Sequence, residues 1–209
     1  MKTLQFITNR TNRFDEIEGA RLALEGGCRY IQLRAKNCPL DEIEQMALLL
    51  LPLCHRYQAK LIINDHVAIA RSVKADGVHL GLSDMSIAEA RRILGPKAII
   101  GGTAHTFEEI KKVYKAGANY AGVGPFRFTK TKKDLRPFLG LEGYSTLLTL
   151  LHIAHIPLPI FAIGGITLKD VPSLRDIGVS GLAISGSLLQ AKDPRMETKQ
   201  FIQAFTTNL

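Results

Sequence analysis

Tryptophan is absent from this 209-residue chain, and aromatic residues of all kinds make up only 7% of it. Proteins that bind single-stranded nucleic acid stack bases on aromatic side chains beside a basic groove. The chain carries 27 Lys and Arg residues against 19 Asp and Glu residues, a formal net charge of +8. Its clearest basic cluster lies on one loop, so we expect small anions as partners rather than nucleic acid.

Cysteine is also scarce. Cys28, Cys38 and Cys54 are odd in number and lack the spacing of a disulfide framework or a metal-binding motif. We therefore expect reduced thiols in a cytoplasmic protein.

Long apolar runs are lacking as well. The most apolar segment, Leu48–Leu53, is far shorter than the roughly 18 residues that a membrane span needs. The first residues, Met1–Thr8, are typical of a strand rather than a signal peptide. We expect no membrane attachment.

Short apolar runs alternate with amphipathic stretches about eight times, without a domain boundary or a low-complexity segment. The runs predict strands at Leu4–Thr8, Tyr30–Arg34, Lys60–Asn64, Gly77–Leu80, Ala98–Gly102, Tyr120–Val123, Ile160–Ile163 and Gly181–Ile184. The amphipathic stretches predict helices at Phe14–Gly26, Asp41–Tyr57, Val67–Val73, Ser86–Leu94, Thr106–Ala116, Leu141–His152 and Leu168–Ile177, with a terminal pair between Ser187 and Phe205.

Strands that alternate with helices are parallel. Eight such units close most naturally into a barrel, so we predict an α/β protein, a single-domain (β/α)8 TIM barrel over residues 1–209. A doubly wound open sheet is the alternative, but no Gly-rich dinucleotide-binding turn follows the first strand.

Polar side chains follow the strands, at the end where such barrels place their active sites. Strand alternation directs Gln32, Arg34 and Lys36 to one side, which is costly in a buried strand unless they bind something. The alternative is that Arg34 and Lys36 are ordinary surface charges.

Two acids follow the third and fourth predicted strands. Asn64 and Asp65 end one strand, and His79 and Asp84 follow the next. Two carboxylates at neighbouring strand ends suit Mg²⁺, which takes one or two of them and keeps several waters. Either acid could instead cap a helix, and Asp84 precedes Ser86 at a predicted helix start.

Anion-binding features follow the later strands. Thr103 and His105 follow the fifth strand, and the segment Gly122–Asp134 leaves the sixth as a loop of hydroxyls and cations that suits a polyphosphate. Gly164-Gly165 and Ser185-Gly186 follow the last two strands, where barrels often bind phosphate through backbone N–H groups. The glycines could also serve only tight turns.

Taken together, these motifs resemble the thiamine phosphate synthase family over nearly the whole chain. The motifs are Gln32-Leu-Arg-Ala-Lys36, Ile63-Asn-Asp65, Asp76-Gly-Val-His-Leu-Gly81 with Asp84, Gly102-Thr-Ala-His-Thr106, Gly122-Val-Gly-Pro125 with Thr129-Lys-Thr-Lys132, and Ala162-Ile-Gly-Gly-Ile166. The resemblance implies a Mg²⁺-dependent enzyme that joins hydroxymethylpyrimidine diphosphate to a thiazole phosphate, with loss of pyrophosphate through a pyrimidine-stabilised carbocation.

The resemblance also implies a role for each matching residue. The metal ligands would be Asp65 and Asp84, and the pyrophosphate contacts Arg34, Lys36, Asn64 and Lys132. The pyrimidine contacts would be Gln32, His79 and Thr103. The thiazole phosphate contacts would be Thr129, Thr131, Gly165, Ile184 and Ser185. His66, Leu82 and Thr103 stand where the family commonly has Arg, Gln and Ser.

Two alternative functions stay open. A thiazole tautomerase shares this barrel, but that family has a His just after the Gly-Val-Gly where this chain has Pro125. A non-catalytic phosphate-binding barrel would leave both acids and Lys132 without a role. The sequence leaves homo-oligomerisation open, and we expect the loop Phe126–Leu139 to order over the diphosphate.

Overall fold

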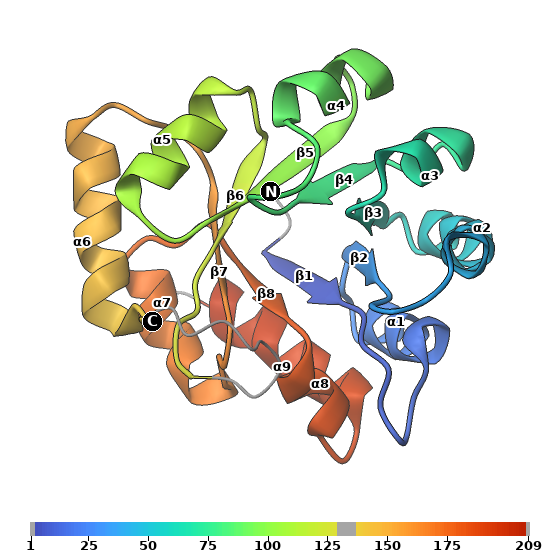
Figure 1. Ribbon diagram of the computed structural model, residues 1–209. Coiled ribbons are helices and arrows are strands. Elements are labelled where there is room, and N and C mark those ends of the chain that lie inside the picture. The colour runs from blue at the N-terminus through green and yellow to red at the C-terminus, as the bar shows by residue number, and fades with distance from the viewer. Residues whose placement is uncertain (1–2, 129–136, 208–209) are drawn as a thin grey trace.

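A computed structural model describes residues 3–128 and 137–207 of the chain. Eight parallel strands close into a barrel in the order of the sequence (Figure 1). They are β1 (Leu4–Ile7), β2 (Tyr30–Arg34), β3 (Lys60–Asn64), β4 (Gly77–Leu80), β5 (Ile99–Ala104), β6 (Tyr120–Val123), β7 (Ile160–Ile163) and β8 (Gly181–Ile184). The predicted TIM barrel is confirmed.

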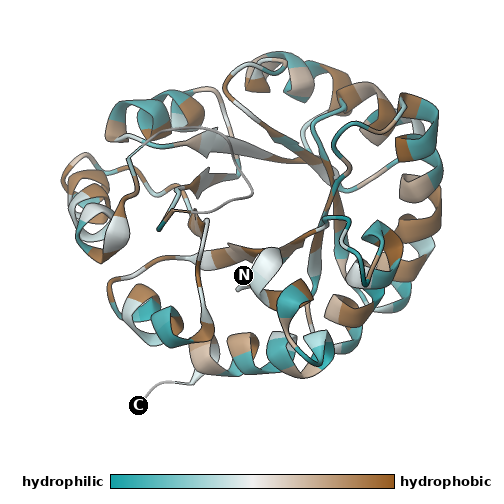
Figure 2. Ribbon diagram, turned by 60° about the horizontal axis from the view of Figure 1, so that its bottom comes forward, coloured by the Kyte–Doolittle hydropathy of each residue, from teal (hydrophilic) through white to brown (hydrophobic). Residues whose placement is uncertain are grey.

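Helices follow the strands and form a ring around them (Figure 2). They are α1 (Glu16–Glu25), α2 (Leu40–Arg56), α3 (Val67–Ser72), α4 (Ile87–Leu94), α5 (Phe107–Lys115), α6 (Gly140–Ile153), the 3₁₀ turn η1 (Leu168–Asp170), α7 (Val171–Asp176), α8 (Gly186–Gln190) and α9 (Pro194–Thr206). The predicted helix between 168 and 177 is thus a 3₁₀ turn followed by a short α-helix.

The sheet closes because its first and last strands pair with each other. In parallel register, β1 pairs with β8, with Gln5 opposite Ala183 and Phe6 opposite Ile184. The open-sheet alternative is therefore wrong, because an open sheet would leave these two strands as unpaired edges.

Side-chain hydroxyls cap the starts of two helices. Ser86 and Thr106 cap α4 and α5 by accepting from the backbone N–H groups of Glu89 and Glu109, each at 3.2 Å. At the start of α5 the Glu109 carboxylate also accepts from the backbone N–H of His105, the residue before the N-cap, at 2.7 Å. A further capping box forms at Thr167.

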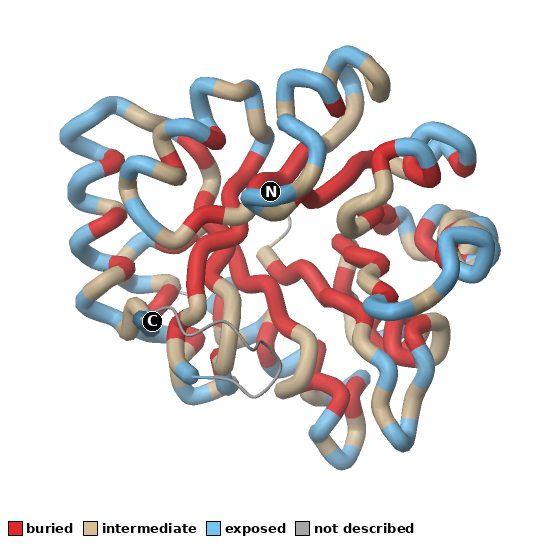
Figure 3. Tube along the Cα trace, in the orientation of Figure 1, coloured by how far each residue is buried: buried red, intermediate tan, exposed pale blue. Residues whose placement is uncertain are grey.

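The buried residues form two hydrophobic clusters. The larger fills the space between the barrel and its helices, while a smaller one fills the barrel interior with Ile7, Tyr30, Ile62, Tyr120, Phe161 and Ala183. Figure 3 shows buried backbone along the strands and alternating burial along the outer helices. The interior cluster fills the barrel, so the barrel is a packed core rather than a pore.

A glycine makes room for one of the two interior tyrosines, Tyr120. Gly101 on β5 pairs with Tyr120 on β6, and a Cβ at Gly101 would lie 2.1 Å from Cζ of that ring. Only glycine lets the ring lie against the neighbouring strand.

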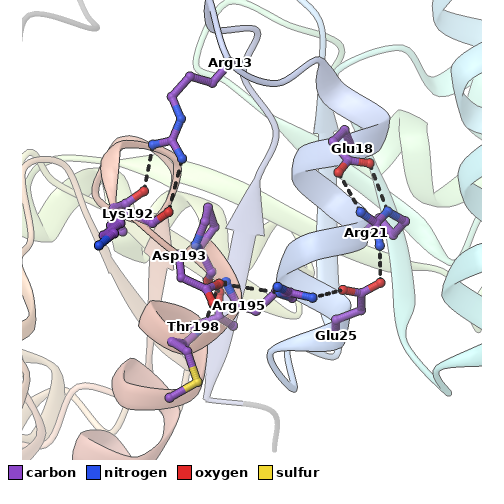
Figure 4. A network of polar contacts seen from close by, with 11 residues as sticks. Arg13, Glu18, Arg21, Glu25, Lys192, Asp193, Arg195 and Thr198 are labelled. Atoms are coloured by element: carbon purple, nitrogen blue, oxygen red, sulfur yellow. Dashed lines mark hydrogen bonds and ion pairs between the residues drawn. The ribbon is translucent and has the colours of Figure 1, made fainter.

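The last helix, α9, lies beside α1 and is tied to it by polar contacts (Figure 4). Arg195 lies 3.6 Å from Glu25 and 3.5 Å from Asp193, and Arg13 donates to the carbonyl of Lys192 at 3.2 Å. Exposed ion pairs contribute little each, so their main effect is to fix where the terminal helix lies.

No helix within residues 3–128 and 137–207 is both long and apolar enough to span a membrane.

Candidate active site

A cavity of about 760 Å³ opens at the carboxyl ends of the strands. Every strand of the barrel contributes a residue to its wall. All the predicted site residues that the structure describes line it: Gln32, Arg34, Lys36, Asn64, Asp65, His79, Asp84, Thr103, Gly165, Ile184 and Ser185. Thr129, Thr131 and Lys132 lie outside the described residues, as does most of the loop Phe126–Leu139.

The alternation predicted for β2 is confirmed. Gln32, Arg34 and Lys36 line the cavity, whereas Leu33 is fully buried on the opposite face. Burial lowers the pKa of the Arg34 guanidinium, and the nearby Asp65 carboxylate partly offsets that shift. An Arg keeps its charge under such conditions, so it presents a fixed, partly desolvated cation to the cavity.

Neither predicted acid is a helix cap. The N-cap of α3 is His66, which makes no side-chain capping bond, and α4 is capped by Ser86. The Asp84 carboxylate instead accepts from the backbone N–H of Gly81, which holds it at the cavity wall. The capping alternative is therefore wrong for both Asp65 and Asp84.

The two carboxylates face each other. Burial raises the pKa of the Asp65 carboxyl, and the charge of Asp84 raises it further. His66 opposes this shift, with its Nδ1 at 3.8 Å from Asp65. Because the repulsion from Asp84 outweighs the effect of His66 on the pKa of Asp65, a divalent cation between the two acids would stabilise this site.

The donor set fits magnesium better than a transition metal. Among the described residues, no cluster of three or more His, Cys, Asp or Glu could hold an ion. A pair of carboxylates beside an anion-binding wall suits Mg²⁺, which completes its shell with waters and substrate phosphate oxygens.

A chain of amides runs from the cavity wall into the barrel interior. Asn64 donates to Gln32 Oε1 at 2.7 Å, and Gln32 Nε2 donates to Gln5 Oε1 at 3.0 Å. Gln5 Nε2 then donates to the hydroxyl of Tyr120, also at 3.0 Å. These bonds fix which end of the Gln32 amide is the donor and which the acceptor.

The chain continues to the histidine. The hydroxyl of Tyr120 lies 3.1 Å from Nδ1 of His79, whose Nε2 lies 3.0 Å from the hydroxyl of Thr103. Burial raises the pKa of Tyr120, so its hydroxyl keeps its hydrogen and can donate it to Nδ1. That arrangement leaves the imidazole hydrogen on Nε2, directed at Thr103.

Gln5 and Tyr120 are site-supporting residues that the sequence analysis missed. Both are almost fully buried, at 1% and 2% exposure, and lie deeper in the barrel than the strand ends. A Gln in the middle of the apolar strand Leu4–Ile7 was the available signal.

Glycines shape the wall formed by β7 and β8. Gly164 and Gly165 have φ angles of +96° and +70°, which residues with a side chain rarely adopt. They line the cavity together with Ser185, which precedes the five-residue helix α8. The hydroxyl of Ser187 donates to the carbonyl of Ile166 at 2.5 Å, which joins the two strand ends.

The ends of the basic loop are held together at this wall. The backbone N–H groups of Leu139 and Gly140 donate to the carbonyls of Pro125 and Phe126, each at 2.9 Å. Phe126 in turn donates to Ile163 at 2.9 Å. The segment that carries Thr129, Thr131 and Lys132 therefore leaves and re-enters the fold beside β7.

Comparison with known proteins agrees with this geometry. A family described as "Thiamine monophosphate synthase" matches residues 4–188. The chain belongs to this family. It is 56% identical over 199 residues to the thiamine-phosphate synthase of Phocaeicola vulgatus, covering 95% of this chain and 96% of the relative. It is 52% identical over 202 residues to that of Bacteroides thetaiotaomicron, covering 97% of each.

A solved relative extends the likeness to three dimensions. The thiamine phosphate pyrophosphorylase of Pyrococcus furiosus superposes with a TM-score of 0.85 at 34% identity, covering 97% of this chain and 95% of that one. The resemblance to the thiamine phosphate synthase family is confirmed. The chain is a transferase of thiamine biosynthesis that acts on small phosphorylated substrates.

Proposed function

We propose that this chain condenses 4-amino-2-methyl-5-hydroxymethylpyrimidine diphosphate with 4-methyl-5-(2-phosphoethyl)thiazole, giving thiamine phosphate and pyrophosphate. The observation that carries the residue assignment is the pair of carboxylates, Asp65 and Asp84, which face each other in a cavity also lined by Arg34 and Lys36. A magnesium ion would balance the two carboxylates, and the diphosphate would balance the two cations.

The pyrimidine would bind against the amide chain. A 4-aminopyrimidine presents a ring nitrogen acceptor beside an amino donor, and an amide offers the complementary pair. Gln32 has its amide orientation fixed by Gln5 and Asn64. His79 and Thr103 complete this part of the wall.

The diphosphate would lie over the ends of β2, β3 and β4. Asp65 and Asp84 would hold Mg²⁺, with Arg34, Lys36, Asn64 and Lys132 around the phosphate oxygens. When bound, the ion supplies positive charge to the departing pyrophosphate. The protein cations add to that stabilisation from fixed positions in a partly desolvated site.

The thiazole phosphate would lie on the wall made by β7 and β8. Backbone N–H groups of Gly165 and Ser185 would bind its oxygens, with Ile184 against the ring and Thr129 and Thr131 from the loop. Since α8 has only five residues, we assign this role to directional N–H groups rather than to a helix dipole.

The reaction balances without proton transfer. The bond between the methylene carbon and the bridging oxygen breaks, and its electron pair leaves with pyrophosphate. The thiazole nitrogen then gives its lone pair to the carbocation. The site fits this dissociative order because its polar groups face the leaving anion, and no nucleophilic side chain is needed.

We further propose that the chain acts in the cytoplasm as one catalytic domain over residues 1–209, without nucleic-acid or membrane partners. A homo-oligomer is compatible with this function.

The test is a coupled incubation of the purified chain with both substrates, with and without Mg²⁺. Thiamine phosphate is read by oxidation to fluorescent thiochrome. Mg²⁺-dependent product supports the proposal. A separate incubation with the thiazole carboxylate phosphate tests the tautomerase alternative, which isomerisation there without condensation in the first would favour.

A further inference from the structure

Arg127 is held by a carboxylate and a backbone carbonyl rather than left for substrate. Its two terminal nitrogens lie 2.6 and 2.7 Å from the two oxygens of Asp170, a bidentate pair. Nη1 also donates to the carbonyl of Gly165 at 2.7 Å. Arg127 therefore bridges the loop after β6 to the turn after β7, although the sequence placed it among the anion-binding cations.

Asp170 is held from a second side as well. Its Oδ2 accepts from the backbone N–H of Thr167 at 2.7 Å and from the Thr167 hydroxyl at 2.8 Å. Partial burial alone would raise the pKa of this carboxyl, but the bonds from Arg127 and Thr167 lower it overall. The acid stays ionised at neutral pH and its position is fixed by four donors.

These contacts orient two peptide groups at the cavity wall. The backbone N–H of Arg127 donates to the carbonyl of Gly164 at 3.0 Å, while its guanidinium holds the carbonyl of Gly165. In a trans peptide the C=O and the following N–H point in opposite directions. The N–H groups of Gly165 and Ile166 therefore face away from Arg127, which is the side of the cavity that both residues line.

The fit between Arg127 and Gly165 is close. A Cβ at Gly165 would lie 2.4 Å from Cγ of Arg127, and the φ angle of +70° already favours glycine. The arginine stem thus fills the space where a side chain at position 165 would be.

We propose that Arg127 and Asp170 are positioning residues for the phosphate of the thiazole substrate, because together they hold the N–H groups of Gly165 and Ile166 toward the cavity. This inference rests on the proposed function for the identity of the ligand. It assigns no substrate contact to Arg127 itself, whose charge is neutralised by Asp170.

The experiment is calorimetric binding of two ligands separately, the thiazole phosphate and Mg²⁺-pyrophosphate, to the full chain and to D170N, R127Q and the double variant. Each single variant should weaken the thiazole phosphate Kd about tenfold, the scale of a lost bond to a charged group. The pyrophosphate Kd should stay within about twofold. The double variant should be no weaker than the singles, because both residues act through one contact.

A matched control is available on α1. Glu18 and Arg21 form a pair of the same kind, with bonds of 2.9 and 2.6 Å, at the outer surface. Glu18→Gln should change neither Kd.

An unchanged thiazole phosphate Kd in both single variants would overturn the inference. An equal rise in the Kd of both ligands would also overturn it, as would a loss of thiazole phosphate affinity in the double variant equal to the sum of the two single losses. These Kd ratios do not depend on turnover. They therefore decide the inference even if the wild-type chain forms no thiamine phosphate, the result that would count against the proposed function.

Discussion

Gln5 Nε2 donates a hydrogen bond of 3.0 Å to the hydroxyl of Tyr120, joining two residues that are 115 positions apart in the chain. This bond links the amides of Gln32 and Asn64 to the imidazole of His79 inside the barrel. The groups that we assign to the pyrimidine are therefore oriented by residues that do not line the cavity.

The first prediction concerns Tyr120→Phe. The change removes the hydroxyl that both Gln5 Nε2 and His79 Nδ1 contact inside the barrel, so we expect the free energy of unfolding to fall by about 1–3 kcal/mol. The KM for the pyrimidine diphosphate should rise while that for the thiazole phosphate stays near its wild-type value. Urea unfolding and steady-state kinetics check this, with Tyr114→Phe on exposed α5 as control. A rise in both KM values would contradict the assignment.

The second prediction concerns the barrel interior. Gly101→Ala would place a methyl group 2.1 Å from the Tyr120 ring, so we expect a loss of about 1–3 kcal/mol or more from overpacking. Gly186→Ala is the control, since its nearest atom would be 3.7 Å away at the end of a flexible side chain. Thermal unfolding of both variants measures the difference, and equal melting temperatures would show that the interior adapts.

The fold was predictable because its signal is repeated. Six of the eight predicted strands, such as Tyr30–Arg34, coincide with the observed bounds, and β1 and β5 differ only at their ends. The bounds of the helices were predicted less accurately than those of the strands, because helix ends depend on local capping. Leu168–Ile177, for example, splits into η1 and α7 where Asp170 turns back to Thr167.

The sequence predicted the site residues at the strand ends but not the supporting residues deeper in the barrel. Alternation located Gln32 and Arg34 correctly, because side-chain direction in a strand is fixed by its period of two. The hydrogen bond between Gln5 and Tyr120 depends on the closure of the barrel, which no local pattern encodes. Likewise, Arg127 lies in the loop Gly122–Asp134, whose cations we expected to bind a polyphosphate, and its partner Asp170 is 43 positions away in the chain.

The third prediction concerns the two acids. We expect Asp65→Asn and Asp84→Asn each to lower kcat/KM by about 100-fold or more, as removal of a group that stabilises a leaving anion does. Without metal, Asp65→Asn should also raise the melting temperature, because it removes a partly buried charge that faces Asp84. Thermal unfolding in EDTA checks this. A lower melting temperature would mean that the two charges do not repel.

The fourth prediction concerns pH. The pKa of Asp170 is lower in the folded protein than the value of about 3.9 expected when unfolded. Its contribution to stability is therefore complete above that unfolded value and is lost as pH falls through the folded one. The difference in unfolding free energy between wild type and D170N should be constant from neutral pH to about pH 5 and shrink below about pH 4. A difference that grows on acidification would mean that folding raises the pKa of Asp170 instead of lowering it.

The most direct test of the account is the stoichiometry of the reaction itself. Purified chain is incubated with the pyrimidine diphosphate and the thiazole phosphate, and thiamine phosphate and pyrophosphate are measured together, in Mg²⁺ and in EDTA. We predict one pyrophosphate for each thiamine phosphate, formed only when both substrates and Mg²⁺ are present. Folded protein that forms no thiamine phosphate, or forms it equally well in EDTA, would contradict the account.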